Sequence, residues 1–157
     1  VKYRRNIMAN KTGTVTAVCT SDIRGIQKTD VGSVKLVEDF GISTDAHAGK
    51  WHRQVSLLSQ EKVDEFNEKG AGVIPGAFGE NILVRGFDFK TLPVGTRFQC
   101  NDVILEMTQI GKECHSHCQI YHKMGTCIMP HEGVFAKVIH GGTINTGDEF
   151  VMLEAEQ

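Results

Sequence analysis

Six short runs of alternating or β-branched residues recur along the chain, and they constrain its fold more than any other feature. They lie at residues 14–18, 33–37, 54–58, 81–84, 103–107 and 149–153. Turn-forming residues separate them at short intervals, a spacing typical of an all-β barrel or sandwich rather than a βαβ sheet. Only two segments have helical character: residues 60–67, with Ser59 as N-cap, and a shorter stretch from about His117 to Met124. We therefore predict a mainly β fold, a β-barrel with a few short helices.

Length and charge limit the possible partners. The chain has 157 residues and a formal net charge of −2, so one domain is expected, without the general positive field that attracts nucleic acid or anionic lipid. No apolar run reaches the roughly 18 residues that span a bilayer. We predict a cytoplasmic protein with no nucleic-acid or membrane partner. Met8 resembles a true start, so we treat residues 1–11 as an N-terminal extension and residues 12–157 as a single domain.

The densest group of reactive side chains follows the run at 103–107. Cys114 lies close in sequence to Lys112 and His117, and a thiolate is favoured by nearby cations and by a helix N-terminus. Cys114 is therefore a candidate nucleophile or metal ligand, and Cys118 is a second thiol in the same segment. The alternative is that these histidines are hydrated surface groups and the cysteines are ordinary buried thiols.

A zinc site competes for the same residues. Cys114, Cys118, Cys127 and His131 supply the sulfur and imidazole ligands that tetrahedral zinc takes. Their spacing permits such a site without being diagnostic of it. A zinc-stabilised binding module is thus one alternative for the chain.

A polar loop precedes the third strand-like run. Asp45 is placed to orient His47 through a ring nitrogen, while Lys50 and Arg53 are suited to a phosphate or another oxyanion. This loop is a candidate anion pocket. The alternative is a surface loop whose charges are simply hydrated.

A glycine-rich segment precedes the fourth run. Gly79 allows backbone amides to approach a ligand beside Phe78, and Glu80 and Asn81 offer polar groups for the edge of a heteroaromatic ring. A tight bulge at the rim of a barrel explains the same residues with no ligand.

These motifs, in this order, resemble the MOSC domain, the C-terminal domain of molybdenum-cofactor sulfurases. The resemblance rests on the segments at 45–49, 53–55 and 75–81, on Cys114 after a strand, on 133–138, and on Gly147-Asp148. It implies a MOSC-like β-barrel that binds the molybdenum cofactor, a molybdopterin, or handles its sulfur through a cysteine. One departure concerns the cysteine: the family's Gln-Pro-Arg-x-Pro-Cys run is replaced here by Gln-Ile-Gly-Lys-Glu-Cys, ending at Cys114.

The resemblance also implies roles for particular residues. Cys114 would ligate molybdenum or carry sulfur as a persulfide, with Lys112, His117 and Cys118 beside it. The pterin-binding residues would be Asp45, His47, Lys50, Arg53, Phe78, Gly79, Glu80 and Asn81. The expected function is cofactor binding with sulfur transfer, with a separate cysteine desulfurase or a molybdoenzyme as partner. The alternative is a molybdenum-dependent reductase of N-hydroxylated compounds that needs an electron donor, so the sequence leaves enzyme or carrier open.

Overall fold

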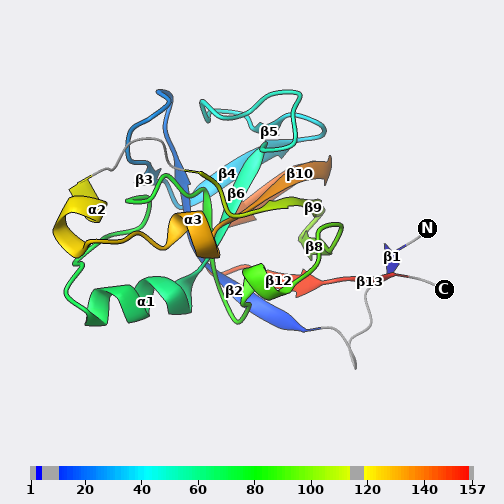
Figure 1. The fold of residues 1–157 in the computed structure, drawn as a ribbon. Coiled ribbons are helices and arrows are strands. Elements are labelled where there is room, and N and C mark those ends of the chain that lie inside the picture. The colour runs from blue at the N-terminus through cyan, green and yellow to red at the C-terminus, as the bar shows by residue number, and fades with distance from the viewer. Residues whose placement is uncertain (1–2, 5–10, 114–118, 156–157) are drawn as a thin grey trace.

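Seven strands close into a barrel in the computed structural model, which describes residues 3–4, 11–113 and 119–155. The strand order is β12-β8-β9-β10-β6-β7-β2, and pairing of β12 with β2 closes the ring (Figure 1). The barrel strands are β2 (Thr12–Thr20), β6 (Val55–Ser59), β7 (Ile82–Arg85), β8 (Arg97–Cys100), β9 (Val103–Ile110), β10 (Val134–His140) and β12 (Glu149–Met152). The mainly β barrel expected from the sequence is confirmed.

Shorter strands and helices surround this barrel. β3 (Thr29–Asp30) pairs with β2, while β4 (Ser33–Val37), β5 (Gly41–Ile42) and β11 (Gly142–Asn145) form a three-stranded sheet, and β1 (Tyr3–Arg4) pairs with β13 (Glu154–Ala155). The helices are α1 (Gln60–Glu68), the 3₁₀ turn η1 (Phe89–Thr91), α2 (Gln119–Met124) and α3 (Met129–Glu132). All six strand-like runs form strands. Figure 1 shows α1 and α2 at the side of the barrel opposite β1 and β13.

One connection in the barrel is a βαβ unit, which the sequence analysis did not predict. The chain leaves β6, forms α1 and returns as β7, which is paired with β6 in parallel. Ser59 has the extended backbone of an N-cap, although its side chain makes no capping hydrogen bond. Val63 and Phe66 are the buried residues of α1, and they belong to the apolar layer outside the barrel. A helix must bury its apolar stripe on a neighbouring element, and the outer face of the barrel provides that surface.

Alternation along the strands divides the apolar residues into two clusters. In β6, Leu57 belongs to the barrel interior and Leu58 to the outer layer; in β7, Ile82 and Leu83 divide in the same way. This follows from the two-residue period of a strand. The interior is filled by a four-ring cluster with centroids 5.0–6.2 Å apart, made of Phe87, Phe89, Phe98 and Phe150.

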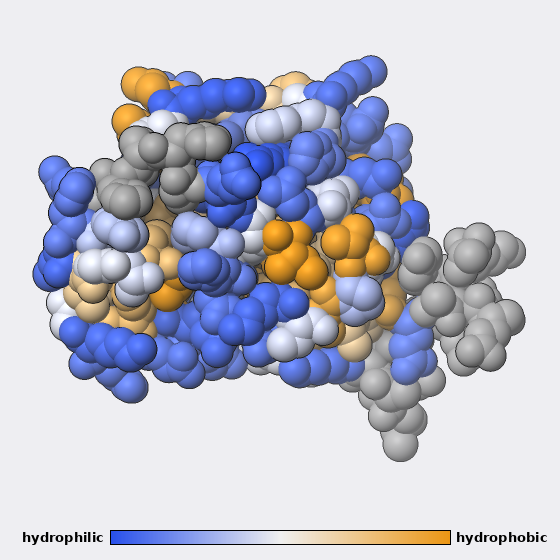
Figure 2. All heavy atoms as spheres, in the orientation of Figure 1, coloured by the Kyte–Doolittle hydropathy of each residue, from blue (hydrophilic) through white to orange (hydrophobic). Residues whose placement is uncertain are grey.

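The face of the molecule in Figure 2 is mostly hydrophilic, with apolar side chains in small separate groups. In the part of the chain that the structure describes, no helix has the length and apolar character needed to cross a membrane.

Candidate functional site

Three neighbouring hollows lie where the helices meet the barrel, and Lys112 lines all of them. The large cavity has a volume of about 700 Å³, a groove beside it about 590 Å³, and the small hollow about 60 Å³. Arg53 lines the groove and the small hollow, whereas Gly79 and Met129 line the large cavity and the small hollow. Because they share these walls, the three hollows form one composite site.

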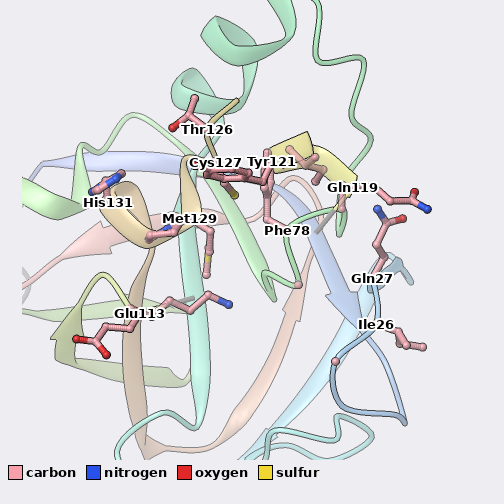
Figure 3. A pocket seen from close by; sticks show the side chains of 16 residues that line it. Ile26, Gln27, Phe78, Glu113, Gln119, Tyr121, Thr126, Cys127, Met129 and His131 are labelled. Atoms are coloured by element: carbon pink, nitrogen blue, oxygen red, sulfur yellow. The ribbon is translucent and has the colours of Figure 1, made fainter. Parts of the chain in front are cut away.

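The large cavity has aromatic and aliphatic side chains in its walls, together with charged residues such as Lys112 and Glu113. Figure 3 shows Phe78, Tyr121 and Met129 among its lining side chains, and the lining also includes Ile26 on the loop that follows β2. The Phe78 ring lies 5.9 Å from that of Phe66 in α1, which supports it from behind. Such walls suit the faces of a planar heterocycle, because aromatic and aliphatic groups stack on ring faces without needing hydrogen bonds.

Gly79 brings backbone to the edge of two hollows. Its φ of +78° lies in the left-handed region that favours glycine, and a Cβ there would meet nothing within 4 Å. The residue therefore leaves space where a side chain would otherwise project. The geometry leaves room for a ligand to approach the backbone closely at this point.

The small hollow is positively charged. His47, Arg53 and Lys112 line it together with Asn81, and no carboxylate is among its lining residues. Within the described residues, neither Arg53 nor Lys112 forms an ion pair with a carboxylate. Two cations that pair with no described carboxylate attract an anion at a concave surface, and a guanidinium can bind oxygens at two points.

Neighbouring side chains fix the guanidinium of Arg53. Its Nε donates a hydrogen bond to Oε1 of Gln109 at 3.3 Å. Its Cζ lies 5.0 Å from the ring centroid of Phe135 and 5.9 Å from that of Trp51. These contacts orient the guanidinium before any ligand binds, so less conformational entropy is lost on binding.

Asp45 lies beneath the site, in a buried ion pair that the sequence did not predict. Its Oδ1 accepts hydrogen bonds from Lys28 Nζ at 2.7 Å and from the Ser21 backbone N–H at 3.0 Å. The Lys28 and Asp45 side chains are 1% and 0% exposed. Burial raises the pKa of the Asp45 carboxyl, but hydrogen bonds with His47 and Lys28 outweigh it and hold that pKa well below its usual value. Asp45 is therefore a buried anion that supports the loop.

The predicted contact between Asp45 and His47 has a different geometry from the one expected. Asp45 Oδ2 accepts from the His47 backbone N–H at 3.1 Å, whereas the ring Nδ1 is 3.7 Å from that oxygen. Nδ1 instead lies 3.0 Å from Lys28 Nζ. Lys28 was missed because its neighbours Gln27 and Thr29 are polar, so no local pattern marks it as buried.

Glu80 is fully buried and holds its own loop. Its carboxylate accepts hydrogen bonds from the backbone N–H groups of Gly76 and Phe78, both at 3.0 Å. Burial raises the pKa of this carboxyl to about 7, although the same backbone hydrogen bonds lower it in part. It lines none of the three hollows. The described contacts of Glu80 are thus to its own loop, whereas the sequence predicted that it would contact the edge of a ligand ring.

Asn81 lines the small hollow, yet its side chain joins two barrel strands. Oδ1 accepts from the Ser56 backbone N–H at 3.0 Å and from the Ser56 hydroxyl at 3.2 Å, while Nδ2 donates to the Cys19 carbonyl at 3.0 Å. These bonds tie β6 and β2 to the start of β7. The amide therefore shapes the floor of the hollow.

Other predicted site residues lie apart or outside the described chain. Lys50 is exposed and lines none of the three hollows. Cys114, His117 and Cys118 fall within residues 114–118, outside the described residues.

The predicted zinc ligands are only partly described. Cys127 and His131 both line the large cavity, whereas Cys114 and Cys118 lie outside the described residues. Among residues 3–4, 11–113 and 119–155, no group of three or more potential ligands is arranged to hold a metal ion.

The seven-stranded barrel and a match to a family model place the chain in a known class. A family model of the MOSC domain matches residues 44–151, well over half of the chain, and the chain belongs to that family. The MOSC family is associated with binding of the molybdenum cofactor.

Solved structures share this fold. The YuaD protein of Bacillus subtilis superposes with a TM-score of 0.73 at 18% identity, covering 99% of this chain and all of that one. YiiM from Escherichia coli superposes with a TM-score of 0.62 at 18% identity, covering 93% of this chain and 71% of YiiM. Another solved structure, described as a hypothetical protein, superposes with a TM-score of 0.70 at 20% identity. The match covers 94% of this chain and 71% of that protein. Among curated proteins, none matches the chain.

Proposed function

We propose that the chain binds the molybdenum cofactor in the three hollows around Lys112 and carries sulfur on Cys114. The observation that carries the proposal is the position of Lys112, which lines all three hollows and stands two residues before Cys114. A single residue thus links the cationic hollow, the apolar cavity and the predicted thiol. The family's association with this cofactor supports the assignment.

The described residues fit a pterin that carries a phosphate. The walls of the large cavity suit the ring system, and Arg53 and Lys112 supply charge for the phosphate. Gly79 leaves the backbone accessible between them. When bound, the cofactor supplies a redox-active molybdenum that soft sulfur ligands suit. The chain's own residues orient the ligand and compensate its charge.

Burial argues against two of the other thiols, Cys19 and Cys100, as the reactive cysteine. Cys19 and Cys100 are buried in the two apolar clusters, and burial raises the pKa of both thiols, that of Cys100 to about 12. A thiol with a raised pKa is a poor nucleophile at neutral pH. Lys112, two residues before Cys114, is a cation that favours a thiolate there. A separate cysteine desulfurase would supply the sulfur, held on Cys114 as a persulfide.

Intact-mass and elemental analysis of protein purified without oxygen tests this function. We expect molybdenum with a pterin, and a mass increment of one sulfur atom on the peptide that contains Cys114. Cys114→Ser should abolish that increment, whereas Cys127→Ser, which changes a thiol that lines the large cavity, should retain it. Stoichiometric zinc without pterin, or an unchanged sulfur load in Cys114→Ser, would overturn the proposal.

A further inference from the structure

Lys28 and His47 make a contact that fixes which ring nitrogen can accept a hydrogen bond. Lys28 Nζ lies 3.0 Å from His47 Nδ1 and 2.7 Å from Asp45 Oδ1. An ammonium group has three donors and no acceptor, so Nδ1 accepts in this contact, and Asp45 Oδ2, at 3.7 Å from Nδ1, is beyond hydrogen-bond distance. The proton of a neutral imidazole is then on Nε2.

The surroundings of Lys28 leave it little freedom to move. Its backbone N–H donates to the Gly76 carbonyl at 2.9 Å, and a Cβ on Gly76 would lie only 2.0 Å from the Lys28 carbonyl oxygen. Glu80 in turn holds the Gly76 backbone N–H. The loop before β7 therefore fixes the backbone position of Lys28. The Lys28 ammonium in turn contacts the imidazole of His47 and orients it.

His47 also faces the small hollow. Its side chain is 35% exposed, and it lines the hollow of about 60 Å³ together with Arg53 and Lys112. The charged groups that surround the ring are thus Lys28 and Asp45 behind it and these two cations beside it.

We propose that Lys28 is a positioning residue that holds His47 as the Nε2–H tautomer, so that His47 donates a hydrogen bond to an oxyanion group in the small hollow. Arg53 and Lys112 supply the charge, and the neutral imidazole adds a directed donor. The volume accommodates one small group such as a phosphate. That this group belongs to a pterin cofactor rests on the proposed function, whereas the tautomer and the donor do not.

The tautomer is measured directly by ¹⁵N NMR of the imidazole in ligand-free protein at pH 8, with the His47 signals identified by their loss in His47→Gln. We expect the shift of an unprotonated nitrogen at Nδ1 and of a protonated nitrogen at Nε2. Lys28→Met should give a mixture of tautomers. A wild-type spectrum with the proton on Nδ1 would overturn the proposal, whether or not Lys28→Met folds.

Amide substitutions test the donor, because the glutamine amide reaches the position of Nε2 and the asparagine amide that of Nδ1. With inorganic phosphate as the probe, we expect His47→Ala and His47→Asn to weaken binding about three- to tenfold, and His47→Gln to keep most of it. Equal loss in His47→Gln and His47→Asn would contradict a donor at Nε2. Phosphate binding without cofactor binding would leave this inference standing and overturn the proposed function.

Discussion

The barrel interior and the layer outside it are built from the same strands but differ in how completely they are filled. Inside, four phenylalanine rings contact one another and are at most 2% exposed. Outside, the apolar layer beneath the short helices borders a cavity of about 700 Å³ and a cationic hollow. The packed interior therefore stabilises the barrel. The outer surface of the same strands can then leave open space for a ligand.

Truncation of an interior ring should have the largest effect on stability. Phe98→Ala removes a ring that contacts Phe87, Phe89 and Phe150, and it should lower the free energy of unfolding by about 3–5 kcal/mol. Phe78→Ala, at the wall of an existing cavity, should cost less than half as much, since fewer contacts are lost. Denaturant unfolding measures both, and equal losses would remove the distinction between the two regions.

The second-largest loss of stability is expected when the buried ion pair beneath the site is broken. Asp45→Asn leaves the Lys28 ammonium buried without its anion, so we expect a loss of about 3 kcal/mol at pH 7. Because the Asp45 carboxyl has a lowered pKa in the folded state, its contribution is present above its unfolded pKa and is lost as the pH falls below about 4. The stability of Asp45→Asn should therefore change less than that of wild type across this acid range.

The raised pKa of Glu80, in the loop before β7, predicts a pH dependence of stability with the opposite sign. Its pKa is about 7 in the folded protein against an ordinary value of 4.5, so the folded state binds the proton more tightly. Its contribution is complete below pH 4.5 and is lost as the pH rises through about 7, by roughly 3 kcal/mol. Unfolding experiments from pH 5 to pH 8 should show this decline, and Glu80→Gln should remove it. A decline of the same size in Glu80→Gln would assign it to another group.

The smallest effect is expected at Lys50. This side chain is exposed and lies away from the hollows, so Lys50→Ala should change stability by less than about 0.5 kcal/mol. It should also leave ligand binding unchanged. Loss of phosphate binding in this variant, measured by titration, would extend the site beyond the hollows that the structure shows.

Local runs of alternating or β-branched residues predicted six of the strands, whereas β10 was missed. β4, with every second residue buried, follows the two-residue period, and the sequence predicted it. β10 begins with three buried residues in succession, so it lacks the alternation that marks a strand with one solvated face. The parallel return of β7 was also missed, since strand direction depends on packing between distant segments.

The site was predictable where a segment has its own chemical signature. Arg53, Gly79 and Lys112 come together as the motifs suggested. Lys28 and Asp45 could not be recognised as a buried pair, because they are 17 residues apart and only the folded loops bring them into contact. Lys50 and Arg53 look alike in sequence, and only the fold separates an exposed cation from one that faces the hollow.

Cofactor affinity in matched lysine variants tests the central claim, that the three hollows around Lys112 bind the phosphate-bearing pterin. The equilibrium dissociation constant should increase about tenfold or more in Lys112→Ala, since a charge-assisted hydrogen bond contributes roughly 1.5–3 kcal/mol. It should stay at the wild-type value in Lys50→Ala. Equal affinities in wild type, Lys112→Ala and Lys50→Ala would contradict the account.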